Sequence, residues 1–198
     1  YGAVNQVMEK GEPEGVGAAG ASVTARERER PQGAAAVQRD AAAEPSVLFA
    51  DAVRAKPAFD AVARRVSAAA GARLEVQALG GVDRHGRPAT GLKKLARVIE
   101  KAALRPGEGR GRTERVCDVV RAMLVAPDMR TVAAILDALA ALARAGVIEV
   151  RRIKNRFASP AGGGWRDVMV NLVVLEGEGG REGHVCEVQI AHEMMLTA

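Results

Sequence analysis

Three short apolar runs near the C-terminal end most strongly constrain the fold of this chain. They lie between Val147 and Ile190 and are separated by the glycine-containing segments Ser159–Gly164 and Glu176–Gly183. Apolar runs of this length, bounded by glycine clusters, are typical of β-strands rather than of helices. The second connection has the composition of a hairpin turn, so the last two runs are predicted to be neighbouring strands.

The segments before these runs carry helical periodicity instead. One helix is predicted from Pro45 to Gly71, kinked or divided at Pro57, a second over residues 92–104, and a third from Asp128 to Gly146. A further strand is predicted over residues 116–125. This order predicts an α+β fold, with a mixed or antiparallel sheet of about four to five strands flanked by helices.

Charge is unevenly distributed along the 198 residues. Residues 1–45 carry five basic and seven acidic side chains and show no apolar periodicity, whereas the whole chain has a net charge of +5. We therefore expect a disordered, low-complexity lead-in over residues 1–45 and a folded, basic domain over residues 46–198. A basic domain favours a polyanionic partner; we expect a nucleotide, with nucleic acid the less favoured choice.

Composition also bears on the compartment. No segment approaches the roughly 18 apolar residues that a membrane span needs, so no membrane partner is expected. The two cysteines, Cys117 and Cys186, have neither metal-ligand nor disulfide-framework spacing, which favours a reduced, intracellular compartment. The chain begins at Tyr1 rather than Met, which we interpret as a fragment of a longer product whose targeting segment and oligomeric state are not readable.

Two carboxylates interrupt the predicted apolar strands. Asp118 and Glu187 each follow a cysteine and are flanked by apolar residues. An unpaired charge inside such a strand costs on the order of several kcal/mol, so each carboxylate needs a partner. In one interpretation the two converge and bind Mg²⁺ together with phosphate oxygens. In the other they form structural ion pairs with arginines such as Arg121 or Arg151. Side-chain alternation places Gln189 on the same strand face as Glu187.

Basic side chains and the only tryptophan accompany these carboxylates. The helix over residues 92–104 has one apolar face, formed by Leu92, Leu95, Ala96, Ile99 and Ala103, and one charged face that includes Lys93 and Lys101. It is either an ordinary amphipathic surface helix or a basic face presented to phosphates. Further positive charge for phosphates would come from Lys154, Arg156 and Arg166. Trp165 follows three glycines and is expected in an exposed loop, where it either stacks on a nucleobase, for about 1–3 kcal/mol, or serves in packing.

Taken in order, four motifs resemble the synthetase domain of RelA/SpoT-type (p)ppGpp enzymes, in particular its divergent algal and other eukaryotic members. They are Cys117-Asp-Val-Val-Arg121, Lys154-Asn-Arg-Phe157, Gly163-Gly-Trp165 and Glu187-Val-Gln-Ile190. The resemblance covers about residues 91–198 and implies a nucleotidyltransferase-like fold. The compartment expected for such a protein is the cytoplasm or a plastid. The resemblance further implies that Asp118 and Glu187 bind Mg²⁺ and organise catalysis. The phosphate-binding lysines of the family are matched by Lys93, Lys101 and Lys154, and its guanine-stacking tyrosine is matched by Trp165.

The activity that this resemblance implies is Mg²⁺-dependent transfer of pyrophosphate from ATP to the 3′-hydroxyl of GDP or GTP, as in guanosine tetraphosphate metabolism. The chain departs from the family pattern at Arg121, Ala161, Asp167 and Met169, where the family has glycine, lysine, serine and histidine, respectively. It departs again at Ile190-Ala-His192, where the family has Ile-Arg-Thr. The alternative is a catalytically degenerate nucleotide- or RNA-binding module of the same fold. A third interpretation is a structural domain of a larger protein.

Overall fold

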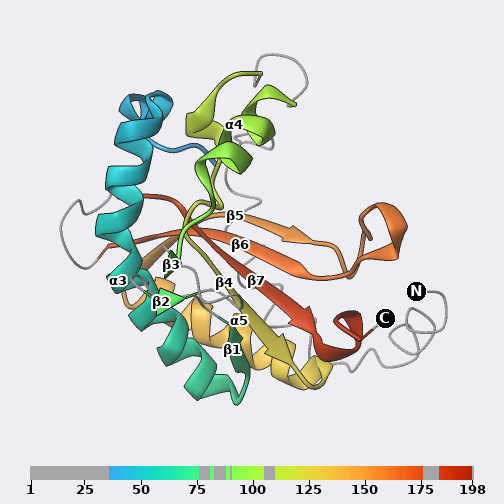
Figure 1. Cartoon of the computed structure of the whole chain (residues 1–198). Helices are drawn as coiled ribbons and strands as arrows, with labels where there is room; N and C mark the ends of the chain where they lie inside the picture. The colour runs from blue at the N-terminus through green and yellow to red at the C-terminus, as the bar shows by residue number, and fades with distance from the viewer. Residues whose placement is uncertain are drawn as a thin grey trace.

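A five-stranded sheet occupies the centre of the molecule (Figure 1). The computed structural model describes residues 36–75, 81–82, 88–89, 91–104, 110–175 and 183–197. In spatial order the sheet contains β1 (Arg73–Glu75), β4 (Arg121–Ala126), β7 (Cys186–His192), β6 (Val168–Val174) and β5 (Ile148–Asn155). Strands β4 and β7 run parallel and the other neighbours are antiparallel, so the predicted mixed sheet is confirmed. Strands β2 (Gly81–Val82) and β3 (Pro88–Ala89) form a separate antiparallel pair.

The last three strands coincide with the three apolar runs of the sequence. Antiparallel pairing joins β5 to β6, with a register shift between Val150 and Arg152, and joins β6 to β7. The predicted hairpin between the last two runs is therefore confirmed, although most of its connecting segment lies outside the described residues.

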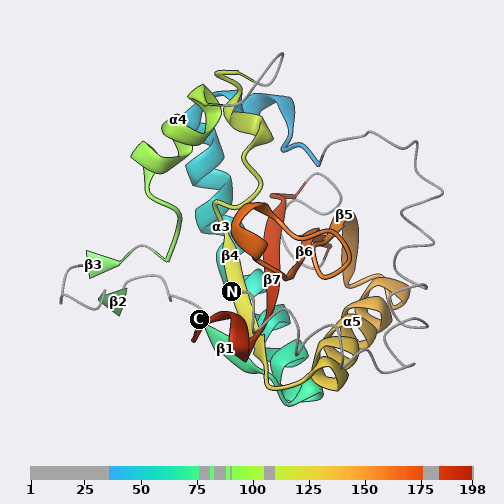
Figure 2. The same ribbon diagram turned by 90° about the vertical axis from the view of Figure 1, so that its right-hand side faces the viewer.

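Two helices cover one face of the sheet, as Figures 1 and 2 show from two sides. Helix α3 (Pro45–Ala70) continues through Pro57 and is not divided there, although proline removes one backbone donor. It ends at Gly71, in the left-handed conformation at a φ of 65°. Helix α5 (Met129–Arg144) begins at Asp128, whose side chain accepts a hydrogen bond from the Thr131 amide at 2.7 Å. None of the described helices combines the length and apolar character that crossing a membrane requires.

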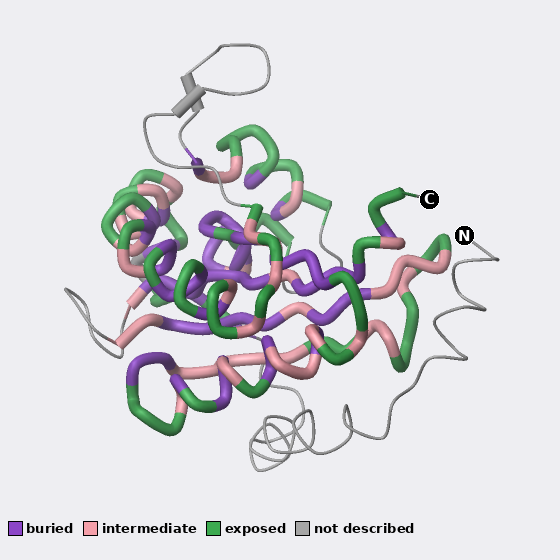
Figure 3. The backbone as a smooth tube through the Cα atoms, turned by 90° about the horizontal axis from the view of Figure 1, so that it is seen from below, coloured by how far each residue is buried: buried purple, intermediate pink, exposed green. Residues whose placement is uncertain are grey.

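The two sheet faces differ in chemistry because side chains alternate along each strand. One face is apolar, packs against α3 and α5, and contributes Leu124, Val170, Val188 and Ile190 to the core. The opposite face carries polar side chains at the paired positions Arg121, Glu187, Asn171 and Arg152. In Figure 3 the central strands are largely buried, whereas the helices are exposed on the sides that face away from the sheet. The polar face is where a ligand can approach the sheet.

Helix α4 (Leu95–Ala103) has a different orientation from the one its apolar pattern predicts. Leu95 and Ile99 are 47% and 51% exposed, whereas Val98 and Ala102 are buried. Lys101 lies on the same side as Val98 and Ala102, and its ammonium group pairs with a buried carboxylate of the domain. We attribute the orientation to this ion pair, which turns the predicted apolar face outward.

Residues 36–44, which the predicted boundary places in the lead-in, pack against the domain. They include the 3₁₀ helix η1 (Asp40–Ala43). The buried amide of Gln38 donates to the Val185 carbonyl at 2.9 Å and accepts from the Val185 amide at 2.7 Å. These two hydrogen bonds attach the segment before η1 to Val185, the residue that precedes β7. The remainder of the predicted lead-in, residues 1–35, lies outside the described residues.

Protonation of His184, beside Gln38, is expected to destabilise the fold in acid. Burial lowers the pKa of His184 from 6.5 to about 4. The unfolded chain therefore binds a proton below pH 6.5 that the folded chain rejects down to about pH 4. Between pH 7 and pH 5 this linkage removes about 2 kcal/mol of stability. Urea denaturation of the wild type and His184→Gln at both pH values tests this, and equal losses in the two proteins would contradict it.

Candidate active site

Asp118 lies three residues before β4, so the prediction that the strand begins at Val116 is wrong at its start. Val119 and Val120 are β-branched, apolar and fully buried, and such residues predict a strand from the sequence. Their carbonyls instead accept hydrogen bonds from the amides of Lys93 at 2.9 Å and Glu187 at 3.0 Å. The chain thereby reaches Asp118 at the end of the sheet, beside the start of β7.

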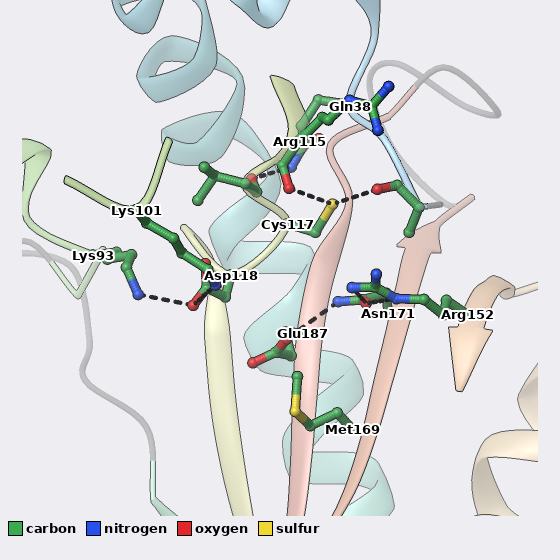
Figure 4. Close-up of polar contacts among 12 residues, drawn as sticks. Gln38, Lys93, Lys101, Arg115, Cys117, Asp118, Arg152, Met169, Asn171 and Glu187 are labelled. Carbon is green, nitrogen blue, oxygen red and sulfur yellow. Dashed lines mark hydrogen bonds and ion pairs between the residues drawn. The ribbon is translucent and has the colours of Figure 1, made fainter. Parts of the chain in front are cut away.

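Asp118 is 5% exposed and is held by two lysines (Figure 4). The Nζ atoms of Lys93 and Lys101 each lie 2.8 Å from its Oδ2 atom. Burial alone would raise the pKa of Asp118, but hydrogen bonds and charge from Lys101 and Lys93 hold it below its usual value. Asp118 therefore stays ionised at neutral pH. Of the two interpretations, the structural ion pair is present at Asp118, but its partners are Lys93 and Lys101 and not Arg121 or Arg151.

Glu187, the second predicted carboxylate, lies on β7 and is 7% exposed. Its Oε2 accepts a hydrogen bond from Asn171 Nδ2 at 3.4 Å. The oxygen of the same amide accepts two hydrogen bonds from Arg152, at 2.9 and 2.7 Å. Burial raises the pKa of Glu187, and the negative charge of Asp118 raises it further. The two carboxylates are therefore close enough to interact, and their pKa values are displaced in opposite directions.

This pair offers oxygen ligands of the kind that a hard cation prefers. The Oδ1 atom of Asp118 is buried and has no hydrogen-bond partner among the described residues, so one carboxylate oxygen remains available as a ligand. No cluster of three or more His, Cys, Asp or Glu ligands occurs in the described part of the chain. Two carboxylates fit Mg²⁺, which usually binds to one or two protein carboxylates and completes its shell with water and substrate phosphates.

A second polar cluster is centred on Asp167, which sequence reasoning noted only as a departure from the family. Its carboxylate is fully buried and accepts hydrogen bonds from Arg156 at 2.5 and 2.7 Å. It also accepts from the indole N–H of Trp165 at 2.9 Å and from the amide of Gln189 at 2.6 Å. Three predicted site residues thus converge on one anion. The sequence feature that could have indicated this cluster is an aspartate placed between Trp165 and the apolar run that follows it.

The other predicted phosphate-binding residues lie near this second cluster. Lys154 is exposed on β5, opposite Met169 of β6. Arg166 donates to the Phe157 carbonyl at 2.6 Å and so closes the base of the β5–β6 connection. Trp165 is half-buried rather than fully exposed, because its indole is anchored to Asp167. The hydrogen bond that Arg156 donates to Asp167 raises the pKa of Arg156, and the charge of Glu187 raises it further. Gln189, which donates to Asp167, alternates on β7 with Glu187 on the same sheet face, so the two clusters share this face.

A groove of about 510 Å³ lies on this face, beside the carboxylates. It runs between β1, β4 and β7 and the segment that precedes α4. Its walls include Glu75, Leu92, Lys93, Arg121, Met123 and Gln189. The mixture of apolar floor and charged wall, at this volume, is typical of a small-molecule site.

Solved structures share this fold. Small alarmone synthetase 1 from Bacillus subtilis matches with a TM-score of 0.52 at 16% identity, over 76% of this chain and 71% of that chain. Small alarmone synthetase 2 from Bacillus subtilis matches with a TM-score of 0.52 at 13% identity, over 78% of this chain and 74% of that chain. The α+β fold expected from the motifs is therefore confirmed as one shared with alarmone synthetases.

A third match is to a chain in the crystal structure of the complex between the type VI effector Tas1 and its immunity protein. The TM-score is 0.51 at 20% identity, over 77% of this chain and 63% of that chain, so this chain spans under two thirds of that protein's length. Identities this low show a common fold alone. No protein-family model matches the sequence, and no curated protein matches it.

Proposed function

We propose that this domain is a RelA/SpoT-like pyrophosphotransferase, which moves pyrophosphate from ATP to the 3′-hydroxyl of GDP or GTP. The observation that carries the proposal is the carboxylate pair beside the start of the inner strands β4 and β7, in a fold shared with small alarmone synthetases. Asp118 is held ionised while Glu187 is pushed toward the neutral form. Opposite shifts in the pKa values of two neighbouring acids are typical of sites in which one acid stays ionised and the other transfers a proton.

In this reaction the 3′-oxygen of the acceptor attacks the β-phosphorus of ATP. The bond from that phosphorus to the oxygen bridging to the α-phosphate breaks, and AMP leaves. Glu187 takes the proton of the attacking hydroxyl, for which a raised pKa makes it a better base at neutral pH. Mg²⁺, bound by Asp118 and Glu187, would neutralise the donor phosphates. Lys93 and Lys101 hold Asp118 and add positive charge beside it.

The acceptor side of the site is assigned to the Asp167 cluster. Trp165 offers an aromatic face for the guanine, and its anchored indole limits the entropy lost on stacking. Lys154 and Arg166 lie on the same hairpin and supply charge near the acceptor phosphates. Arg156 is already neutralised by Asp167, so its part is to orient the cluster more than to bind phosphate.

The same ion pairs favour the alternative, a nucleotide- or RNA-binding module without turnover. Three predicted phosphate-binding residues, Lys93, Lys101 and Arg156, are engaged by carboxylates of the domain itself. Such a module would bind nucleotides while releasing no product.

Incubation with Mg²⁺, ATP labelled in its terminal phosphates, and GDP or GTP separates the two functions. We expect label in guanosine tetraphosphate or pentaphosphate and release of AMP, with no transfer when Mg²⁺ is chelated. A preparation that binds ATP and the guanine nucleotide, yet releases no labelled product, would overturn the enzyme in favour of the binding module.

A further inference from the structure

Arg121 stands out among the cations of the polar sheet face. Its side chain is exposed, it lines the groove, and it forms no hydrogen bond or ion pair with a described residue. By contrast, Lys93 and Lys101 are bound to Asp118, while Arg152 donates to Asn171. A guanidinium with five donors that is held at a groove wall is well suited to bind an anionic group.

The register of the sheet places Arg121 next to the candidate catalytic carboxylates. Arg121 is the cross-strand partner of Glu187 in the parallel β4–β7 pair, so the two side chains leave the same sheet face. Asp118 precedes it by only three residues. An anion bound by Arg121 would therefore lie beside the two carboxylates, at the end of the groove where the reacting group must be.

The remaining walls of the groove suit the rest of a nucleotide. Leu92 and Met123 provide apolar surface for a base, and Lys93 adds positive charge on the same side as Arg121. Gln189 and Glu75 offer hydrogen-bonding groups, and Glu75 is itself paired with Arg73. An apolar floor that leads to two cations matches a nucleotide whose phosphates point toward the carboxylates.

We propose that Arg121 binds the phosphate chain of the donor nucleotide in this groove and determines the affinity of the domain for a nucleoside triphosphate. The proposal rests on the proposed function for the identity of the donor, but not for the binding itself. At this position the resembling enzymes carry glycine, so this residue is a feature of the present chain. Guanidinium groups bind phosphates through paired, charge-assisted hydrogen bonds.

Calorimetric titration with ATP and with inorganic tripolyphosphate, both with Mg²⁺, tests the role of Arg121. Loss of a hydrogen-bonded charge in Arg121→Gln is expected to weaken binding of both ligands about tenfold. Arg121→Lys should retain part of the affinity, because it keeps the charge without the paired donors. Arg144→Gln, an equal charge change at an exposed position near the end of α5, is the matched control and should bind as the wild type does.

Unchanged affinity in Arg121→Gln would overturn the proposal, as would an equal loss in Arg144→Gln, which would indicate net charge alone. Thermal melting should be the same for these variants, because both side chains are exposed. Binding that depends on Arg121 without labelled product would overturn the transferase and leave this inference standing. Absence of ATP binding by the wild type would overturn both.

Discussion

Glu187→Gln is expected to lower pyrophosphate transfer by at least about 100-fold, since general-base catalysis typically contributes 10²–10⁴-fold. The substitution preserves the shape of the side chain and its contact with Asn171, but it removes the proton acceptor and one charge of the pair. Transfer rates under saturating ATP and acceptor measure the effect. Glu193→Gln, an exposed carboxylate just after β7, is the matched control and should leave the rate unchanged.

The same substitution is expected to stabilise the domain at neutral pH. Burial and the charge of Asp118 raise the pKa of Glu187, so ionising this carboxyl costs free energy in the folded state. The cost is fully present above the raised pKa of the folded state and is absent below the ordinary pKa of 4.5. Glu187→Gln should therefore raise the free energy of unfolding at pH 7 by about 0.5–2 kcal/mol, the usual size of a stabilising substitution. The gain should shrink as the pH falls from the raised pKa of the folded state toward the ordinary value of 4.5, and it should be absent below that value. A less stable variant at pH 7 would contradict the electrostatic account.

The last three strands illustrate what sequence can predict. Their apolar residues form short runs bounded by segments that contain glycine, so local patterns predict their positions. The two-residue period of a strand then places Glu187 and Gln189 on one face. The β4–β7 pairing is different, because it joins residues that are more than 60 positions apart in a parallel ladder. No local pattern specifies such a neighbour, although the resemblance to alarmone synthetases implied that Asp118 and Glu187 meet.

The errors at Asp118 and α4 have one physical cause. Both arise where a long-range ion pair overrides a local apolar pattern. One lysine that holds Asp118, Lys93, precedes α4, and the other, Lys101, lies in its last turn, where its ion pair accompanies the outward orientation of Leu95 and Ile99. Asp167 was missed for a related reason, since a carboxylate that accepts hydrogen bonds from one strand, β7, and from two residues of the β5–β6 connection has no signature in the sequence.

Asp167→Asn is expected to have the largest effect on stability of the substitutions considered. The carboxylate is fully buried and accepts from Arg156, Trp165 and Gln189, whereas an asparagine would direct its own N–H groups at some of these donors. Removal of one partner of a buried ion pair costs about 3–5 kcal/mol. We expect the lower end, because the Arg156 side chain is 27% exposed and can recover some hydration. Glu100→Gln, in the exposed pair with Arg97, should cost less than about 0.5 kcal/mol.

A double-mutant cycle with Arg156→Gln separates the ion pair from the other contacts. If Asp167 acts mainly through Arg156, the double variant should be little less stable than Asp167→Asn alone, and additive losses would contradict the pairing.

Trp165 fluorescence and the KM for the acceptor nucleotide together test whether Asp167 acts in the acceptor site. It is the only tryptophan of the chain, so its fluorescence reports on this cluster alone. Release of the indole N–H should increase quenching by acrylamide while the domain is still folded. The KM for the acceptor nucleotide should then rise by a larger factor than the affinity for ATP falls, because Asp167 positions the face on which the guanine is proposed to stack. Of the Asp167 cluster, only Gln189 also lines the donor groove. An equal loss for both nucleotides would place Asp167 in the general scaffold instead of the acceptor site.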